Sequence, residues 1–262
     1  IAFSPFEMAA GVRDFFPFLE AGIANIISEK NFLYISTGNR PHGFNTVARR
    51  RGVFSIAYDW LMSKGYGCDP NLKLITVGFS EGGIRAREFQ SYLLGESNYP
   101  SPSYDPIVHQ TKVAAVITMN TPHHGAATSR SFRQSTTVDR LSRISAFFRV
   151  LLTKTRCFDR IIPMLAMRPR VYRWQNYWFE TAQIPLVISI YNTQDTLVRS
   201  DETRPWTSGA LGRHLGERNL HIQHEGWGHK PQHSLGTFDP ENPISLSVLR
   251  KSLVLAIQMT KK

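Results

Sequence analysis

Short apolar runs and longer amphipathic stretches take turns along this chain. The apolar runs are rich in β-branched and aromatic residues and show no regular alternation, which is typical of strands buried on both faces of a parallel sheet. The amphipathic stretches carry apolar residues at helical spacing. This order predicts a single α/β domain over residues 1–262, built on a doubly wound, mostly parallel sheet whose functional site lies at the carboxyl ends of the strands. We expect strands at residues 1–3, 31–36, 72–77, 113–119, 184–191 and 219–224, and helices at 12–27, 46–64, 83–94 and 244–259.

The second of these helices shows the pattern clearly. Residues 46–64 lie between two expected strands and have the length of a crossover helix. Their apolar positions recur at helical spacing, so we expect one face to pack on the sheet. The residues expected on that face are Val53, Ile56, Ala57, Trp60 and Leu61.

Residues 126–180 interrupt the alternation of strands and helices. They hold eleven lysines or arginines against three acids, so +8 of the net charge of +11 falls in this segment. Within it, residues 138–152 carry apolar side chains at helical spacing among arginines, which predicts an amphipathic basic helix. We interpret the segment as a cap or lid inserted in the domain, over a hydrophobic site. A solvated charged face on an ordinary packing helix fits the same pattern equally well.

The whole chain is basic, with 31 lysines and arginines against 20 acids. A protein of this charge favours anionic surfaces, and both nucleic acid and an anionic lipid interface are candidates. The sequence contains no run of 18 apolar residues, so we expect no membrane span within it.

The two cysteines and the first residue say little about the compartment. Cys68 and Cys157 permit at most one disulfide, and a bridge and two separate thiols both remain open. The chain begins at Ile1 rather than at a methionine, which we interpret as processing or trimming, with any signal peptide outside the sequence.

One pentapeptide carries chemistry. Residues 78–82 read Gly-Phe-Ser-Glu-Gly, and they follow an expected strand and lead into an expected helix. Glycines at both ends allow a sharp turn that holds the central Ser80 strained at the top of a sheet, with its hydroxyl exposed for attack on a carbonyl. The flanking strand and helix make this pattern specific, because the five residues alone arise often by chance.

A serine hydroxyl needs an imidazole to take its proton and a carboxylate to orient the imidazole, and both partners are expected at strand ends. Asp195 follows the strand at 184–191, with Asp201 as the alternative acid. His229 lies in a glycine-rich loop after the last expected strand, with His233 as the alternative base. The order of Ser80, Asp195 and His229 along the chain is the one that this kind of serine turn uses.

At these residues the chain resembles the α/β-hydrolase superfamily, and within it the bacterial true lipases and related serine esterases. Residues 78–83 are similar to their nucleophile elbow, residues 120–125 (Asn-Thr-Pro-His-His-Gly) to the segment after the next strand, and residues 195–198 (Asp-Thr-Leu-Val) to their acid loop. The resemblance covers most of the chain. It implies the α/β-hydrolase fold and hydrolysis of carboxylic esters through an acyl-enzyme on Ser80, with no cofactor.

The resemblance also implies an oxyanion hole of two backbone amides, from Phe6 and from Glu81 just after the nucleophile. Ser4 and Pro5 stand where the lipases usually carry His-Gly, so this chain departs from their pattern before Phe6. Some of these lipases bind a structural calcium, but Asp239 and Glu241 do not form a convincing ligand set here. The adjacent His123 and His124 also follow an expected strand, but neighbouring side chains in an extended segment point opposite ways, which disfavours a shared metal.

The substrate that this resemblance implies is a lipid or another hydrophobic acyl ester. An amidase, a thioesterase or a deacylase of a lipid anchor would use the same triad. A catalytically silent scaffold that binds an anionic surface is the alternative from another class. We expect the basic 126–180 segment to dock on an anionic lipid interface and expect no nucleic acid partner. A secreted and a membrane-peripheral location both fit, and the oligomeric state is open.

Overall fold

The structure is a computed structural model and describes residues 1–4, 15–35, 47–66, 69, 71–93, 112–121, 186–193, 195, 219–224 and 243–260. These residues form one sheet in which every pair of neighbouring strands is parallel, in the order β2-β1-β3-β4-β5-β6. The strands are β1 (Ala2–Phe3), β2 (Tyr34–Ile35), β3 (Lys73–Phe79), β4 (Lys112–Met119), β5 (Leu186–Tyr191) and β6 (Asn219–Gln223). The helices are α1 (Phe15–Ile23), α2 (Val47–Ser63), α3 (Glu81–Leu93) and α10 (Pro243–Thr260), with the short 3-10 helix η1 (Glu29–Asn31) before β2.

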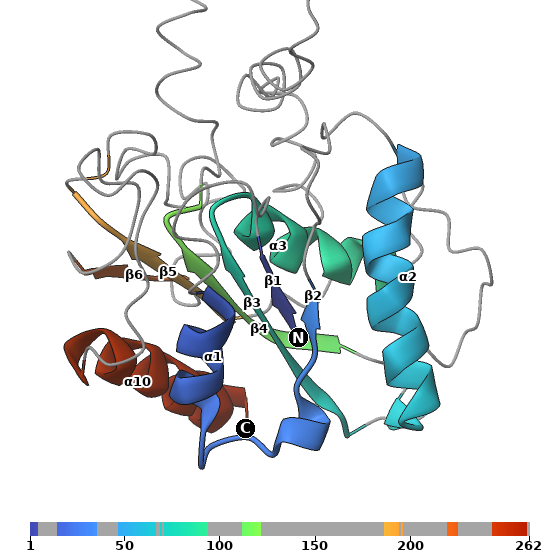
Figure 1. The fold of residues 1–262 in the computed structure, drawn as a ribbon, viewed down its shortest axis with the longest axis horizontal. Coiled ribbons are helices and arrows are strands. Elements are labelled where there is room, and N and C mark those ends of the chain that lie inside the picture. Colours follow the sequence, from blue (N-terminus) through green and yellow to red (C-terminus); the bar gives the residue numbers. More distant parts are fainter. Residues whose placement is uncertain are drawn as a thin grey trace, which may run out of the picture.

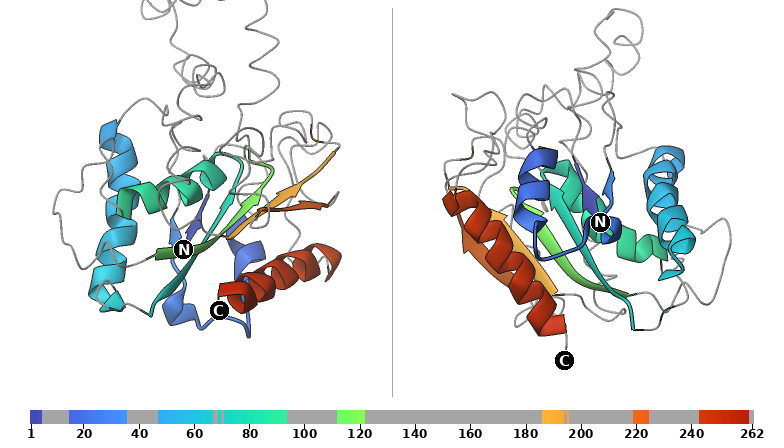
Figure 2. Two further views of the ribbon diagram at one scale, coloured as in Figure 1. Left: turned by 180° about the vertical axis from the view of Figure 1, so that it is seen from behind. Right: turned by 60° about the horizontal axis from the view of Figure 1, so that its bottom comes forward.

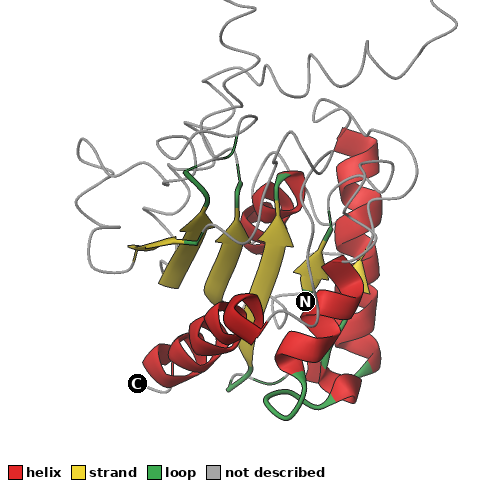
Figure 3. Ribbon diagram, turned by 60° about the vertical axis from the view of Figure 1, so that its left-hand side comes forward, coloured by secondary structure: helices red, strands yellow, loops and turns green. Residues whose placement is uncertain are grey.

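Helices cover both faces of the sheet (Figure 1). Helices α1 and α10 pack on one face, where Phe18 and Leu253 belong to a core cluster that includes Ile117 and Ile188 from the strands. Helices α2 and α3 pack on the other face (Figures 2 and 3) and form a second cluster that contains Phe54 and Phe89. Because both faces are buried, the central strands read as continuous apolar runs. The doubly wound parallel α/β architecture predicted from the sequence is confirmed.

A bulge in β4 decides which of its side chains meets which helix layer. Leu74 pairs with Val113, but the next residue of β3, Ile75, pairs with Ala115. The extra residue, Ala114, reverses the alternation, because one unpaired residue moves every later side chain to the other face. Val113 therefore lies in the cluster under α2 and α3, whereas Ala115 lies in the cluster under α1 and α10.

Two expected elements have different bounds in the structure. The expected strand at 31–36 is only Tyr34–Ile35, because Asn31 belongs to η1 and pairing with β1 begins at Tyr34. The expected helix at 12–27 is described from Phe15 and ends at Ile23, and Asn25 just after it has φ 65°, the left-handed conformation with which helices often end.

The buried face of α2 is also rotated from the expected one. Phe54, Ala57 and Leu61 are buried at helical spacing, whereas Ile56 is 54% exposed. The large aromatic ring of Phe54 lies between β1 and α3 through ring contacts with Phe3 and Phe89, and this packing sets the rotation of the helix. The basic helix expected at 138–152, and with it the cap or lid at 126–180, lies outside the described residues, so the insertion and the single-domain boundary remain predictions.

Candidate active site

The carboxyl ends of the central strands meet at one edge of the sheet. Phe79, Met119 and Ile190 form a row of paired residues across β3, β4 and β5. The residues that follow this row are therefore neighbours as well. The Ser80 amide donates to the Met119 carbonyl (2.8 Å) and the Asn120 amide donates to the Ile190 carbonyl (2.8 Å), so the turns after β3 and β4 begin as extensions of the ladder.

Ser80 lies in the single-residue turn between β3 and α3. Its φ is 51°, a left-handed conformation that costs a residue with a side chain about 1–2 kcal/mol. Its carbonyl accepts from the Gly83 amide (3.1 Å), which closes the turn into the first turn of α3. The side chain is half-buried. Strain of this kind is found where a structure holds a functional group in a particular place, and here it lifts the serine out of the strand.

The glycines around Ser80 are required by close approach of the backbone. A Cβ on Gly78 would overlap with the Gly82 carbonyl group, and a Cβ on Gly82 would overlap with the Phe3 carbonyl oxygen. A Cβ on Gly83 would overlap with the hydroxyl of Thr121 at the end of β4. The three glycines thus let α3 begin directly against the ends of β1 and β4.

This turn lies at the topological switch point of the sheet. β1 and β3 are neighbours, but the helix that follows β1 packs on one face and the helix that follows β3 packs on the other. The two connections leave in opposite directions, and ligands of open parallel sheets bind in the crevice that such a divergence creates. Ser4 and Ser80 follow the two strands at this point, and the first amides of α3, beginning at Glu81, have no acceptor within the helix.

The expected acid follows β5 at the same edge. Asp195 is 6% exposed, and its amide donates to the Asn192 carbonyl (3.2 Å) in a short turn after the strand. The Asn192 amide in turn donates to Oδ1 of Asn120 at the end of β4 (3.0 Å). A buried carboxyl group in this place can hold an imidazole in one orientation and stabilise its charged form.

Two expected site residues lie outside the described residues: Phe6, which would supply one oxyanion-hole amide, and the base His229. The alternatives Asp201 and His233 lie outside them as well. Glu81 is described as the first residue of α3, directly after the serine. Phe79, directly before the serine, belongs to the core cluster under α1 and is 1% exposed.

His224 was expected within the last strand and lies just after β6, where the structure gives it a role. Its amide continues the ladder by donating to the Tyr191 carbonyl (2.8 Å). Its Nε2 shares a hydrogen bond with Oγ of Ser245 in α10 (3.1 Å), and both side chains are buried. The pair thereby joins the two ends of residues 225–242, the stretch of chain that carries His229.

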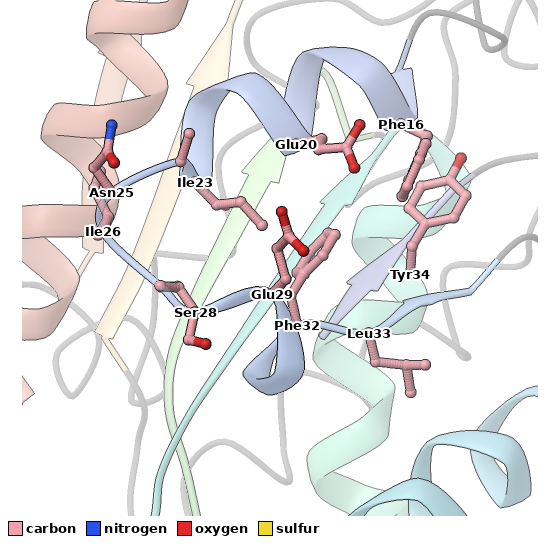
Figure 4. A pocket seen from close by; sticks show the side chains of 12 residues that line it. Phe16, Glu20, Ile23, Asn25, Ile26, Ser28, Glu29, Phe32, Leu33 and Tyr34 are labelled. Atoms are coloured by element: carbon pink, nitrogen blue, oxygen red, sulfur yellow. The ribbon is translucent and has the colours of Figure 1, made fainter.

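A groove elsewhere on the molecule is lined by α1, the turn after it and the residues that enter β2, with a volume of about 890 Å³. Figure 4 shows the carboxyl groups of Glu20 and Glu29 at this groove, with Phe16 beside Tyr34. None of its described lining residues belongs to the expected triad.

Over the described ranges, no three histidine, cysteine, aspartate or glutamate side chains gather where they could hold a metal ion. Within the same residues, no helix combines the length and the apolar character needed to cross a membrane.

No protein-family model matches the sequence. No curated protein matches it in sequence either. Among solved structures, the chain is similar to the mature form of the Bacillus licheniformis lipase BlEst2, with 14% identity over 96% of this chain and 90% of that chain and a TM-score of 0.52.

It is also similar to esterase 2 of Thermogutta terrifontis, solved after phosphoramylation by tabun, with 15% identity over 97% of this chain and 81% of that chain and a TM-score of 0.54. A structure of the native Est2 esterase of the same species shows 17% identity over 98% of this chain and 79% of that chain, with a TM-score of 0.51. At these identities the similarity concerns the fold, and it agrees with the parallel sheet and the two helix layers. The chain therefore has the α/β-hydrolase fold, and its structure resembles those of bacterial lipases and esterases.

Proposed function

We propose that the protein is a serine hydrolase that cleaves carboxylic esters, with lipid or other hydrophobic acyl esters as its substrates. The observation that carries the proposal is the strained Ser80 turn at the switch point of the sheet, with φ 51° and three glycines that the close backbone approach requires. A turn that served only to connect β3 to α3 would have no need of a strained serine at this place.

In the proposed reaction, the Ser80 hydroxyl attacks the ester carbonyl while His229 takes the hydroxyl proton. Asp195 orients the imidazole and stabilises its charged form. The amides of Glu81 and Phe6 stabilise the oxyanion of the tetrahedral intermediate. Collapse of the intermediate breaks the ester bond, and His229 gives its proton to the departing alcohol. Water then attacks the acyl-enzyme with His229 as the base again, which releases the carboxylic acid and restores Ser80.

Ester substrates are favoured because the similar structures include a lipase and an esterase, one of them phosphoramylated by tabun. An amidase, thioesterase or lipid-anchor deacylase would share the triad, and a substrate screen ordered by acyl length and leaving group separates these classes.

The experiment that tests the proposal is treatment of the purified protein with a fluorophosphonate, followed by intact mass measurement and peptide mapping. We expect one modification, at Ser80, and no modification in Ser80→Ala, which should keep its fold but lose turnover of short acyl esters. Full turnover in Ser80→Ala would overturn the proposal. A folded wild-type protein that neither reacts nor turns over esters would instead support a silent scaffold that binds an anionic surface.

Matched variants in the same experiment assign the acid and the base. His229→Ala should stop labelling while His233→Ala does not, and Asp195→Asn should slow labelling by about 10⁴-fold while Asp201→Asn does not. The reverse result for either pair would move the role to the alternative residue.

A further inference from the structure

Asn120 connects the turn that carries Ser80 to the loop after β5 that carries Asp195. It is the first residue after β4, 1% exposed, and its φ is 44°. Asparagine is one of the few residues with a side chain that tolerate this left-handed conformation, because its short amide bonds locally. The turn aims the side chain along the edge of the sheet, where Oδ1 accepts the amide proton of Asn192 (3.0 Å).

A relay of hydrogen bonds therefore crosses three strand ends. The Ser80 amide donates to the Met119 carbonyl at the end of β4, and the side chain of the next residue, Asn120, accepts from the Asn192 amide. The Asn192 carbonyl then accepts the amide of Asp195 (3.2 Å). In this relay the Asn120 side chain makes a contact that the regular ladder between β4 and β5 does not supply, because the ladder has already ended at Ile190.

We propose that Asn120 is a positioning residue that sets the place of Asp195 relative to Ser80; this inference rests on the proposed triad. The Asn120 side chain fixes where the chain turns after β5, and that turn fixes the backbone of the acid. A shift of this loop by about 1 Å would misorient the base and could cost about 10²-fold in rate, although Asn120 touches none of the reacting atoms.

Asn120→Gly is the direct variant, because glycine adopts φ 44° without strain and only the side chain is lost. Asn120→Asp is the conservative variant, because a carboxylate oxygen can accept the same amide proton. The matched control is Thr118→Val. Thr118 Oγ1 donates to Ser189 Oγ (3.3 Å) across the same two strands, so valine removes one buried side-chain hydrogen bond between β4 and β5 without touching the acid loop.

The variants are compared by the rate of fluorophosphonate labelling at Ser80, by kcat and KM for a short acyl ester, and by hydrogen exchange of residues 191–195. We expect Asn120→Gly to lower kcat and the labelling rate about ten- to a hundredfold with KM changed less than about twofold, and to speed exchange in the acid loop. Asn120→Asp should recover most of the rate. The kcat and the labelling rate of Thr118→Val should stay within about twofold of the wild-type values, although its Tm should fall by as much as that of Asn120→Gly.

Equal rate losses in Asn120→Gly and Thr118→Val, or unchanged exchange at 191–195 in Asn120→Gly, would overturn the inference. Its failure is distinguishable from failure of the proposed function. If the triad proposal is wrong, the wild-type protein itself shows no Ser80 labelling. If only the inference is wrong, the wild type is labelled and Asn120→Gly reacts at the same rate.

Discussion

At the scale of single residues, two residues of the site have a left-handed backbone conformation, which most side chains disfavour. Ser80 and Asn120 both have positive φ, and both follow the last residue of a central strand. They differ in how the conformation is tolerated. Asparagine is a residue that often adopts this conformation, whereas serine rarely does, and Ser80 is held there by the packing of α3 against β1 and β4.

This difference predicts the stability of two variants that both lack the Ser80 hydroxyl. Alanine keeps the steric penalty at φ 51°, and glycine removes it, so Ser80→Gly should exceed Ser80→Ala by about 1 kcal/mol in free energy of unfolding. Urea unfolding with an unchanged m-value measures the difference. Glycine equal to or less stable than alanine would mean that the serine turn is not strained in solution.

At the scale of elements, the hydrogen bond between His224 and Ser245 ties the end of β6 to the first turn of α10. Residues 225–242, which include the proposed base, lie between these two points, so the pair joins the two ends of this segment. A segment whose ends are held has fewer conformations available, so if His229 is the base, as proposed, the pair should favour its approach to Ser80.

We therefore expect Ser245→Ala to lower the free energy of unfolding by about 1 kcal/mol and ester turnover by about tenfold. The control is Ser252→Ala in the same helix, because Ser252 is also buried but its hydroxyl donates to the Val248 carbonyl within α10 (2.8 Å). Turnover should fall in the first variant and stay within about twofold in the second. A parallel fall in both would show that turnover follows the stability of the helix rather than the closure of the loop.

At the scale of the whole molecule, charge is distributed unevenly, with +8 of the net +11 in residues 126–180. If this segment docks on an anionic lipid surface, its binding energy comes from long-range attraction that salt screens. The proposal thus makes binding, rather than the chemistry of the triad, depend on ionic strength.

Binding to vesicles that contain anionic lipid should weaken steeply with salt, and replacement of Arg140, Arg143 and Arg149 by glutamine should weaken it at low salt. Cosedimentation measures both effects. The control replaces Lys64, Lys73 and Lys251, three exposed lysines of the described part, so that the same charge is lost elsewhere. Vesicle binding that does not depend on salt, or that falls equally in the control variant, would mean that these arginines do not hold the protein on the anionic surface.

The parts of the fold that could be predicted from the sequence are those with a clear pattern of apolar residues. Apolar runs marked β3, β4 and β5 closely, because strands buried on both faces leave a strong signal. The same runs hid the bulge at Ala114, since a run that is apolar throughout does not show which face a residue meets. The strand expected from residue 31 was too long, because Asn31 belongs to η1 and composition does not show that Phe32, although extended, lies before the strand begins at Tyr34.

The candidate site could be predicted from sequence only where a motif requires a particular backbone conformation. The glycines around Ser80 predict a sharp turn, and the structure has that turn. The sequence analysis includes Asn120 only in the segment that resembles the lipases. An asparagine directly after a buried strand can by itself predict a left-handed turn. The choice between Asp195 and Asp201, or between His229 and His233, depends on loop conformation, for which the sequence carries no periodic pattern.

The direct pairing of β4 with β5, across the whole of residues 120–185, also bears on how the chain can change. The entropy lost when a long connection is closed grows only with the logarithm of its length, by about 0.6 kcal/mol for each doubling. Lengthening, shortening or exchanging the basic segment should thus barely affect the sheet, provided that the turn at Asn120 and the start of β5 at Leu186 are kept. If the basic segment caps the site, as predicted, exchange of this segment could give the scaffold new substrates with little loss of stability.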